Sequence, residues 1–258
     1  MIDAGSDVSD ATPPIDAVAP DVDAGLGSYT SEVMADSPAS WWRLGETSTS
    51  AQAVDEMKVQ NGTFQLPGVT LGVLGAIAKD PNTAMSLDGT NGALVLPGSL
   101  YDLGGTVPFA IEVWLSPGAP PPLDAGDPDR RVVSHRTDSP YFGWYMEIDP
   151  NQRLVFTRWD QDTQLDQLIS KPLVQDKYSH VVVSADGASM SLYVNGVLVA
   201  ATPQSAITPN VAANAFAWGS LSDLDGEFLN GSLDEPAIYT HALAPSRVLA
   251  HYQAGIGN

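Results

Sequence analysis

The sequence predicts an all-β fold, in which two antiparallel sheets stack as a sandwich and a short helix lies at the C-terminal end. Three observations support this prediction. Apolar and polar residues alternate over many short segments, turn-forming pairs such as Asn195–Gly196 separate these segments, and a helical pattern occurs near the C-terminus. Period-two alternation is typical of strands with one buried face, and frequent turns are typical of sandwiches and jelly rolls.

Residues 1–27 differ in composition from the rest of the chain. Six aspartates alternate there with Ala, Gly, Ser and Pro, and no aromatic or basic residue occurs. Such a segment buries too little apolar surface to offset the entropy lost on ordering. We therefore expect a disordered acidic tether over residues 1–27 and a single domain over residues 28–258. The tether resembles the linkers that follow the anchor of bacterial surface proteins.

The clearest strand pair is "SMSLYVNGVLVA", residues 189–200. Asn195–Gly196 suits a two-residue type I′ turn, because both residues must reach positive φ. This turn places Leu192 opposite Val199 and predicts one apolar face, which consists of Met190, Leu192, Val194, Val197 and Val199. Tyr193 and Leu198 are expected on the opposite face.

Four further segments show the same alternation: residues 109–115, 144–148, 154–159 and 178–184. In the first of them, "FAIEVWL", Phe109, Ile111, Val113 and Leu115 share one face, and Glu112 and Trp114 share the other. The expected helix is "APSRVLAHYQAG". Pro245 suits its first turn and Gly255 suits the position just after its end.

The charge and composition exclude several functional classes. The net charge is −20, so a nucleic acid would be repelled, whereas a divalent cation is a plausible partner. No cysteine is present, which excludes disulfides and thiolate chemistry. No apolar run is long enough to span a bilayer. No signal peptide begins the sequence, and we expect any export signal to lie outside this chain.

Five segments in a fixed order resemble the LamG-like jelly-roll family, the bacterial branch of the concanavalin A-like lectin/glucanase superfamily. They are "ADSPASWWRLGE", "AMSLDGTNGALVLP", "PFAIEVWL", "YSHVVVSADGASMSLYVNGVLVA" and "FLNGSLDEPAIYTHALAPSRVLAHYQAG". The resemblance implies a curved two-sheet sandwich from a secreted or surface protein. It implies a module that binds glycans, proteins or calcium, without naming the ligand.

The adjacent acids Asp234 and Glu235 raise the question of a catalytic pair or a metal site. Neighbouring strand residues point to opposite faces, so the two carboxylates are not expected to flank one scissile bond. The resemblance implies a structural calcium held by a carboxylate on the final strand. We therefore predict Asp234 as a calcium ligand, with Glu46 and Asp88 as partners. The alternative is that Asp234 accepts hydrogen bonds from loop amides.

A sugar-binding face is the second predicted site. Aromatic rings stack on sugars, while carboxylates and arginines bond hydroxyl groups. The residues predicted for this face are Glu112, Trp114, Tyr145, Glu147, Arg158 and Trp159. The alternative is that these aromatic side chains belong to the core or lie under loops.

The segment "EIDPNQ" bears on catalysis. Hydrolases with this fold carry three acids in an E-x-D-x-x-E strand motif, but the third position here is Gln152, which cannot protonate a leaving group. We therefore predict a non-catalytic module. Together with the family resemblance, this predicts a monomeric binding or adhesion module of an exported bacterial protein, located outside the cell or at its surface. It would recognise a glycan or an extracellular protein. The alternatives are a glycan-cleaving enzyme and a structural spacer without a ligand.

Overall fold

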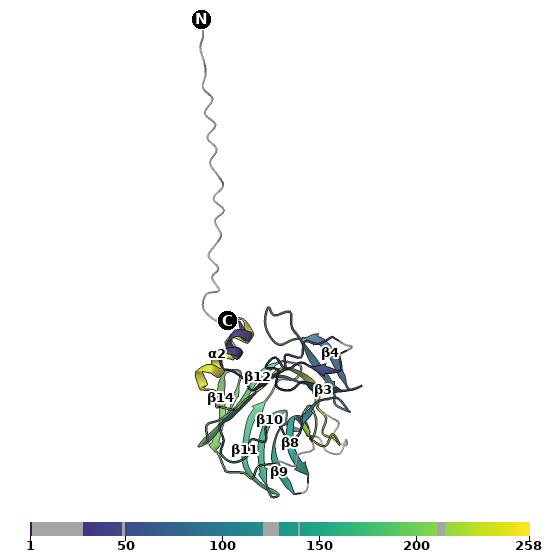
Figure 1. Ribbon diagram of the computed structural model, residues 1–258, viewed down its shortest axis with the longest axis vertical. Helices are drawn as coiled ribbons and strands as arrows, with labels where there is room; N and C mark the ends of the chain where they lie inside the picture. Colours follow the sequence, from purple (N-terminus) through teal and green to yellow (C-terminus); the bar gives the residue numbers. More distant parts are fainter. Residues whose placement is uncertain (2–27, 48–49, 121–128, 139, 211–214) are drawn as a thin grey trace.

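The computed structural model describes residue 1 and residues 28–258, except 48–49, 121–128, 139 and 211–214. Its described part is a sandwich of two eight-stranded antiparallel sheets (Figure 1). The predicted all-β fold is therefore confirmed. The tether predicted for residues 1–27 lies outside the described residues, apart from Met1. No described helix has the length and apolar character that crossing a membrane requires.

The first sheet has the strand order β14-β13-β12-β7-β16-β5-β4, and the short strand β1 also pairs with β16. Its strands are β1 (Ser40–Trp41), β4 (Val69–Leu74), β5 (Thr83–Asp88), β7 (Phe109–Pro117), β12 (Ser179–Ala185), β13 (Ser189–Val194), β14 (Val197–Pro203) and β16 (Asn230–Tyr239). The last strand, β16, therefore lies in the middle of this sheet, between β7 and β5.

The second sheet has the order β11-β10-β9-β8-β15-β6-β3-β2. Its strands are β2 (Gln52–Ala53), β3 (Gly62–Gln65), β6 (Ala93–Pro97), β8 (Arg130–Asp138), β9 (Tyr141–Ile148), β10 (Arg153–Asp160), β11 (Thr163–Pro172) and β15 (Ala215–Trp218). Strands β2, β3 and β6 lie at one end of this sheet, and β9, β10 and β11 lie at the other.

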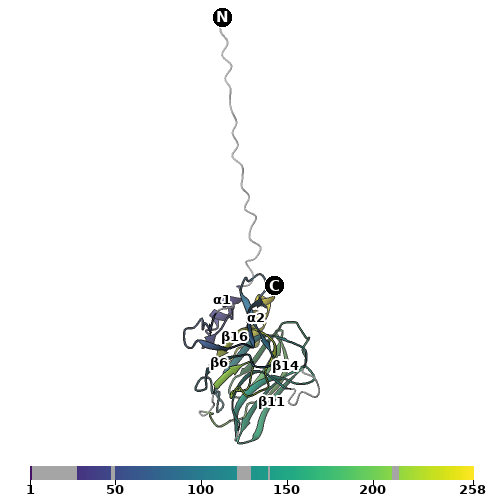
Figure 2. The ribbon, with the colours of Figure 1, turned by 90° about the vertical axis from the view of Figure 1, so that its right-hand side faces the viewer.

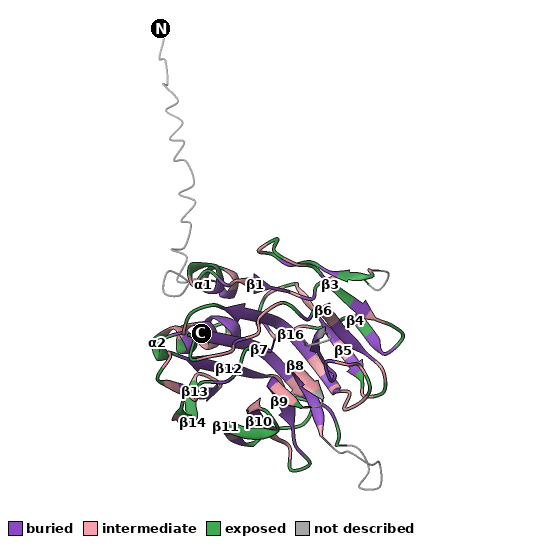
Figure 3. Ribbon diagram, turned by 60° about the horizontal axis from the view of Figure 1, so that its bottom comes forward, coloured by how far each residue is buried: buried purple, intermediate pink, exposed green. Residues whose placement is uncertain are grey.

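The main core fills the space between the two sheets, where the inward side chains of both meet. The predicted faces of β7 are confirmed, because Phe109, Ile111, Val113 and Leu115 are all fully buried in this core. Figure 3 shows the central strands of the first sheet almost entirely buried. A second, smaller core lies on the outer face of the first sheet, beneath two helices.

The hairpin of β13 and β14 turns as predicted, with Asn195 at φ 53° and Gly196 at φ 74°. Val194 pairs with Val197, but Leu192 pairs with Ala200 rather than with Val199. A bulge at Val199 causes this one-residue shift. Because β14 is an edge strand, its apolar residues also stay exposed instead of joining the core face.

The described part of the chain has two helices, whereas the sequence predicted one. Helix α2 (Pro245–Ile256) ends later than predicted, because Gly257, not Gly255, adopts the left-handed cap conformation. The unpredicted helix α1 (Tyr29–Ala35) begins at Ser28, whose side chain accepts a hydrogen bond from the Ser31 amide at 3.3 Å. Figure 2 shows α1 and α2 together at one end of the sandwich.

Candidate functional site

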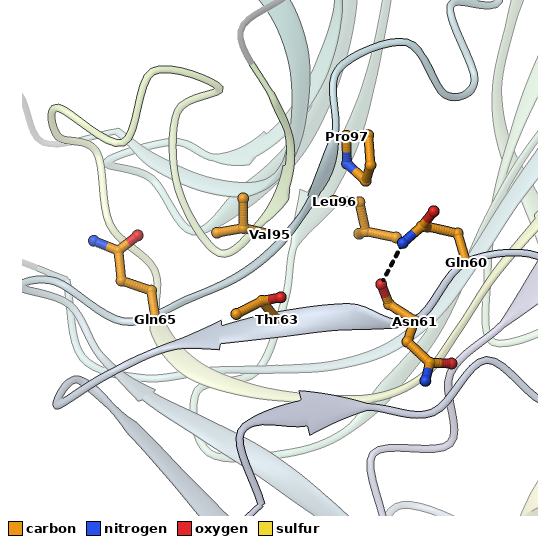
Figure 4. A pocket seen from close by; sticks show the side chains of 7 residues that line it. All are labelled: Gln60, Asn61, Thr63, Gln65, Val95, Leu96 and Pro97. Atoms are coloured by element: carbon orange, nitrogen blue, oxygen red, sulfur yellow. Dashed lines mark hydrogen bonds between the residues drawn. The ribbon is translucent and has the colours of Figure 1, made fainter.

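A shallow hollow opens on the outer face of the second sheet, at the end formed by β2, β3 and β6 (Figure 4). Its volume is about 540 Å³, and its lining residues are Gln60, Asn61, Thr63, Gln65, Val95, Leu96 and Pro97. A second hollow of about 560 Å³ adjoins it and shares Gln60, Asn61 and Thr63. We call these two hollows together the amide pocket, because carboxamide side chains dominate their polar lining.

The strand pattern of β3 places the polar side chains in the pocket. Gly62 and Phe64 are buried, while Thr63 and Gln65 point to the outer face. Val95 on β6 also points to the outer face, because it pairs with Thr63 on β3 and Ala217 on β15, and paired residues share one face of a sheet. The result is a surface with an apolar strip on β6 beside hydroxyl and carboxamide groups on β3.

Asp55 builds the loop that forms one wall of the pocket. Its buried carboxylate accepts hydrogen bonds from the amides of Met57, Val59 and Gln60 at 2.9–3.1 Å. It also accepts one from the Ser40 hydroxyl at 2.7 Å. Because its hydrogen bonds hold this loop in place, Asp55 serves the geometry of the pocket and is not a free acid within it.

Gln65 has the most informative polar atom in the pocket. Its Oε1 is buried, and it has no hydrogen-bond partner among the described residues. A buried acceptor without a donor costs about 1–3 kcal/mol, and a ligand in the pocket can supply that donor once the Gln65 carboxamide turns towards the hollow. The groups that line the pocket bind hydroxyl groups and CH surfaces well, and the acid among the described lining residues is Asp55, whose carboxylate is held by the loop amides.

The predicted sugar-binding residues lie in three separate places. Tyr145, Glu147 and Trp159 come together on the outer face of the second sheet, at the end away from the amide pocket. Trp159 Nε1 donates to Tyr145 Oη at 3.2 Å, and Glu147 forms an ion pair with Arg131. The guanidinium of Arg131 also lies 3.9 Å from the centre of the Tyr145 ring. Tyr145 is only 7% exposed, so of these three side chains only that of Trp159 presents substantial surface.

Glu112 and Trp114 lie on the other sheet and do not belong to an open face. Both are buried on the outer side of β7, under α1 and α2. The Trp114 ring packs directly against α2 at Gly255, where a Cβ added to the glycine would lie 2.2 Å from the ring. The prediction that Glu112 and Trp114 contact a sugar is wrong, because the two helices cover the alternating face that carries them.

Glu112 is instead the centre of a buried hydrogen-bond network. Tyr29 Oη and Tyr239 Oη donate to it at 3.0 and 2.8 Å, and His180 Nε2 and His251 Nδ1 lie at 2.8 and 3.0 Å. Burial raises the pKa of Glu112, but the charge of His251 and the histidine hydrogen bonds outweigh it and hold this pKa well below its usual value. The ionised carboxylate joins both helices to the sheet.

Arg158 lies between the two sheets and is completely buried. Its guanidinium pairs with Asp166 at 3.2 Å and donates to the carbonyl oxygens of Leu103, Gly105 and Ser205. The prediction that Arg158 bonds sugar hydroxyls is therefore wrong. On β10 the side chain of Arg158 shares the inward face of Leu154 and Phe156, which the period-two pattern itself implies.

The structure does not bring Glu46, Asp88 and Asp234 together as a metal site. Glu46 accepts from the Val54 amide at 2.7 Å, and Asp88 bonds to Thr90 in its own turn. In the described part of the chain, no group of three or more His, Asp or Glu side chains has a geometry that would hold a metal ion. The calcium prediction therefore depends on Asp234, whose buried Oδ1 has no hydrogen-bond partner among these residues.

Asp234 and Glu235 do not follow simple alternation. Glu235 has φ 54°, and a bulge between Asp234 and Ala237 buries both carboxylates. Burial raises the pKa of Asp234 to about 7, although the Ala76 amide donates to its Oδ2 at 2.7 Å. Burial and the Asp234 charge raise the pKa of Glu235 to about 8. The guanidinium of Arg43 supplies the positive charge here, at 2.9 Å from Glu235 and 2.7 Å from Asp80.

Calcium binding at Asp234 has a direct thermal test. If Asp234 binds calcium, as the sequence predicted, added Ca²⁺ should raise the melting temperature of chelated protein, because an ion that binds only the folded state stabilises it by about 2.7 kcal/mol at a hundredfold excess over Kd. Differential scanning calorimetry would measure this shift, with Mg²⁺ and the Asp234→Asn variant as controls. An unchanged melting temperature, or the same rise in the variant, would contradict the prediction that Asp234 binds calcium.

The amide pocket was not among the predicted sites, although the sequence carries a signal for it. In "NGTFQL" the residues Thr63 and Gln65 alternate with Gly62 and Phe64, which marks a strand with a polar outer face. Thr63 and Gln65 are neither aromatic nor acidic, whereas both predicted sites consisted mainly of aromatic and acidic residues. The sequence could not show that the loop held by Asp55 and strand β6 lie on either side of this face and form a hollow there.

Comparison with known proteins agrees with this architecture. No curated protein matches the sequence. Among solved structures, the binding domain of botulinum neurotoxin serotype G aligns with a TM-score of 0.58 at 13% identity, over 83% of this chain and 50% of its own. The binding domain of Paraclostridial Mosquitocidal Protein 1 gives 0.62 at 16%, over 83% and 51%.

A Trypanosoma rangeli sialidase in complex with sialic acid aligns with a TM-score of 0.59 at 11% identity, over 83% of this chain and 32% of its own. This chain thus spans about half the length of the toxin domains and about a third of the sialidase. These likenesses concern the fold alone. The family described as the concanavalin A-like lectin/glucanases superfamily matches residues 88–249, which is more than half of the sequence. The chain therefore belongs to the concanavalin A-like lectin/glucanase superfamily.

Proposed function

We propose that this chain is a non-catalytic module that binds a neutral glycan in the amide pocket. The observation that carries this proposal is the carboxamide of Gln65, which lines the pocket beside Thr63 and whose Oε1 has no donor among the described residues. Carboxamide and hydroxyl groups pair with sugar hydroxyls, and Val95 and Pro97 offer apolar surface to the CH groups of a sugar ring.

The charge of the chain favours a neutral ligand over an acidic one. The net charge is −20, so a sulfated or carboxylated glycan would be repelled as it approached. Lys58 is the single basic residue among the described residues that line the pocket, and Asp55 lies beside it. A neutral polysaccharide or oligosaccharide on an extracellular surface fits these conditions. We therefore propose that the module acts outside the cell.

The acids of the segment "EIDPNQ" support a non-catalytic role. Glu147 is paired with Arg131, whereas Asp149 accepts from the Asn151 and Arg153 amides and from Arg153 Nε. Both carboxylates therefore have structural partners, whereas most glycoside hydrolases use a pair of carboxyl groups that flank the scissile bond. Solved structures of this fold include binding domains and a sialidase, so the site and not the fold carries the argument.

The Gln65→Leu variant tests the proposed site. The substitution keeps the approximate shape and removes the carboxamide, so we expect affinity for a neutral glycan to fall about tenfold or more. The measurement is binding to an array of neutral and acidic glycans, followed by calorimetry with the best ligand. Thr63→Val should weaken binding in the same direction, because it removes one hydroxyl from the same strand.

Gln164→Leu is the matched control, because Gln164 is an exposed glutamine on β11 at the far end of the same sheet. It should leave affinity unchanged. Loss of binding in Trp159→Ala, with Gln65→Leu unaffected, would place the ligand at the aromatic end and contradict the proposal. Release of free sugar from a polysaccharide panel would favour an enzyme. An empty array together with an empty pull-down would favour a spacer.

A further inference from the structure

Strand β14 is an edge of the first sheet that approaches β11 of the second sheet, and it has an exposed apolar surface at its start. Its first three residues, Val197, Leu198 and Val199, are 62%, 53% and 39% exposed. Figure 3 shows this strand as exposed, at the end of the sheet next to α2. Leu249 of α2 extends the apolar surface, because its side chain is 40% exposed and lies close to Gly196, the turn residue just before β14. A Cβ added at Gly196 would lie 2.9 Å from Leu249 Cδ1.

This edge is also the least charged part of the chain. No Asp, Glu, Lys or Arg occurs from Gly187 to Ser222, a stretch that includes β13 and β14, although the whole chain has a net charge of −20. Two copies of such an acidic chain repel each other across most of their surfaces. The repulsion is weakest where both copies present uncharged strands.

The other three sheet edges carry features that discourage pairing with another chain. Strand β2 has only two residues, and β11 ends in Lys171 and Pro172 and contains two register shifts. Strand β4 is broken by a bulge at Gly72, and its partner β5 ends at the carboxylate of Asp88. Short strands, charges, prolines and bulges are the usual protections of an edge. Strand β14 also has one bulge and ends in Pro203, but it keeps a run of exposed aliphatic side chains at its start, far from the proline.

We infer that β14 is a self-association edge, at which a second copy of this chain adds its own β14 in antiparallel orientation. A strand that is apolar and uncharged is complementary to itself, so a two-fold axis would satisfy both copies at once. An ionic partner would find no opposite charge on this edge. The inference departs from the monomer that the sequence predicted. It does not depend on the proposed function, although a dimer would present two amide pockets and gain avidity on a repeating glycan.

Sedimentation equilibrium of the full chain tests this inference. Wild-type protein should shift from 27.2 kDa towards twice this mass as its concentration rises into the high micromolar range. Added NaCl should strengthen the association, because it screens the repulsion between the two acidic copies. Leu198→Lys should raise the dissociation constant about tenfold or more, since the dimer would bury a lysine without a partner.

Leu74→Lys is the matched control, because Leu74 is an 88% exposed leucine on the opposite edge strand β4. It should dimerise like the wild type, and equal melting temperatures would show that both variants fold. A wild-type protein that stays monomeric at high concentration and high salt overturns the inference. So does a dimer that Leu198→Lys leaves intact, or one that Leu74→Lys disrupts.

Discussion

Replacing Glu112 by Gln is expected to lower the free energy of unfolding by about 3–5 kcal/mol, the usual cost of removing one partner from a buried charge pair. Glu112 is fully buried and meets two histidines and two tyrosine hydroxyls. The neutral amide of the variant brings an N–H donor to a place where other donors already converge. The melting temperature should fall by about 10 °C, given the usual conversion for a chain of this size.

The loss should depend on pH through His251. Burial lowers the pKa of this histidine, but the charge and hydrogen bond of Glu112 and the charge of Asp36 together raise it above its usual value. A raised histidine pKa gives stability that is complete below about pH 6.5 and is lost as the pH rises through the folded-state pKa. The difference between wild type and Glu112→Gln should therefore shrink from pH 6 to pH 9.

Urea unfolding at both pH values measures this difference. Glu56→Gln makes the same change on an exposed side chain and should shift stability by less than about 0.5 kcal/mol. Tyr239→Phe, which removes one donor to Glu112, should cost about 1 kcal/mol. A Glu112→Gln protein as stable as the wild type at pH 6 would show that the network does not hold the helices in place.

The sequence predicted the sandwich because strand alternation is a local property. In β7, the faces of Phe109 and Glu112 follow from the two-residue period alone, whatever lies above or below the sheet. What covers the outer face is not local. Nothing near Trp114 in the sequence shows that α1 and α2, from opposite ends of the domain, pack over it. The sugar-binding prediction for Glu112 and Trp114 was wrong for that reason.

Other errors concern single residues at which the backbone leaves the regular strand. Glu235 has positive φ, so two neighbouring acids that alternation would separate both become buried. Val199 forms a bulge that shifts the β13–β14 register by one residue. Neither residue is a glycine, and neither has a local signal that marks the bulge. Arg158 differs, because alternation with Leu154 and Phe156 already placed it inside the sandwich.

Replacing Arg43 by Met is expected to lower the free energy of unfolding above pH 8, by about 1.4 kcal/mol for each unit by which the pKa of Glu235 rises, because the change leaves the buried Glu235 carboxylate without its counter-ion. Methionine retains an apolar stem beside the Trp41 ring, which the guanidinium covers at 5.3 Å. Stability should be measured by urea unfolding in chelator, so that bound cations do not contribute.

The pH dependence separates loss of charge from loss of packing. The pKa of Glu235 is about 8 with Arg43 present, and removal of the guanidinium raises it further. A raised carboxyl pKa means that the folded state holds its proton while the unfolded state releases it, so stability falls as the pH rises from about 4.5 towards the folded-state pKa. The cost of Arg43→Met should therefore be small at pH 5 and largest at pH 8 or above.

Two further variants complete the test. Arg153→Met removes an arginine that is paired with Asp149 but 41% exposed, and this surface pair should contribute less than about 1 kcal/mol. Glu235→Gln in the Arg43→Met background should restore part of the lost stability at pH 10, because the unpaired buried charge is then gone. If Arg43→Met costs the same at pH 5 and pH 10 and Glu235→Gln restores nothing, the arginine acts by packing and not as the counter-ion of the last strand.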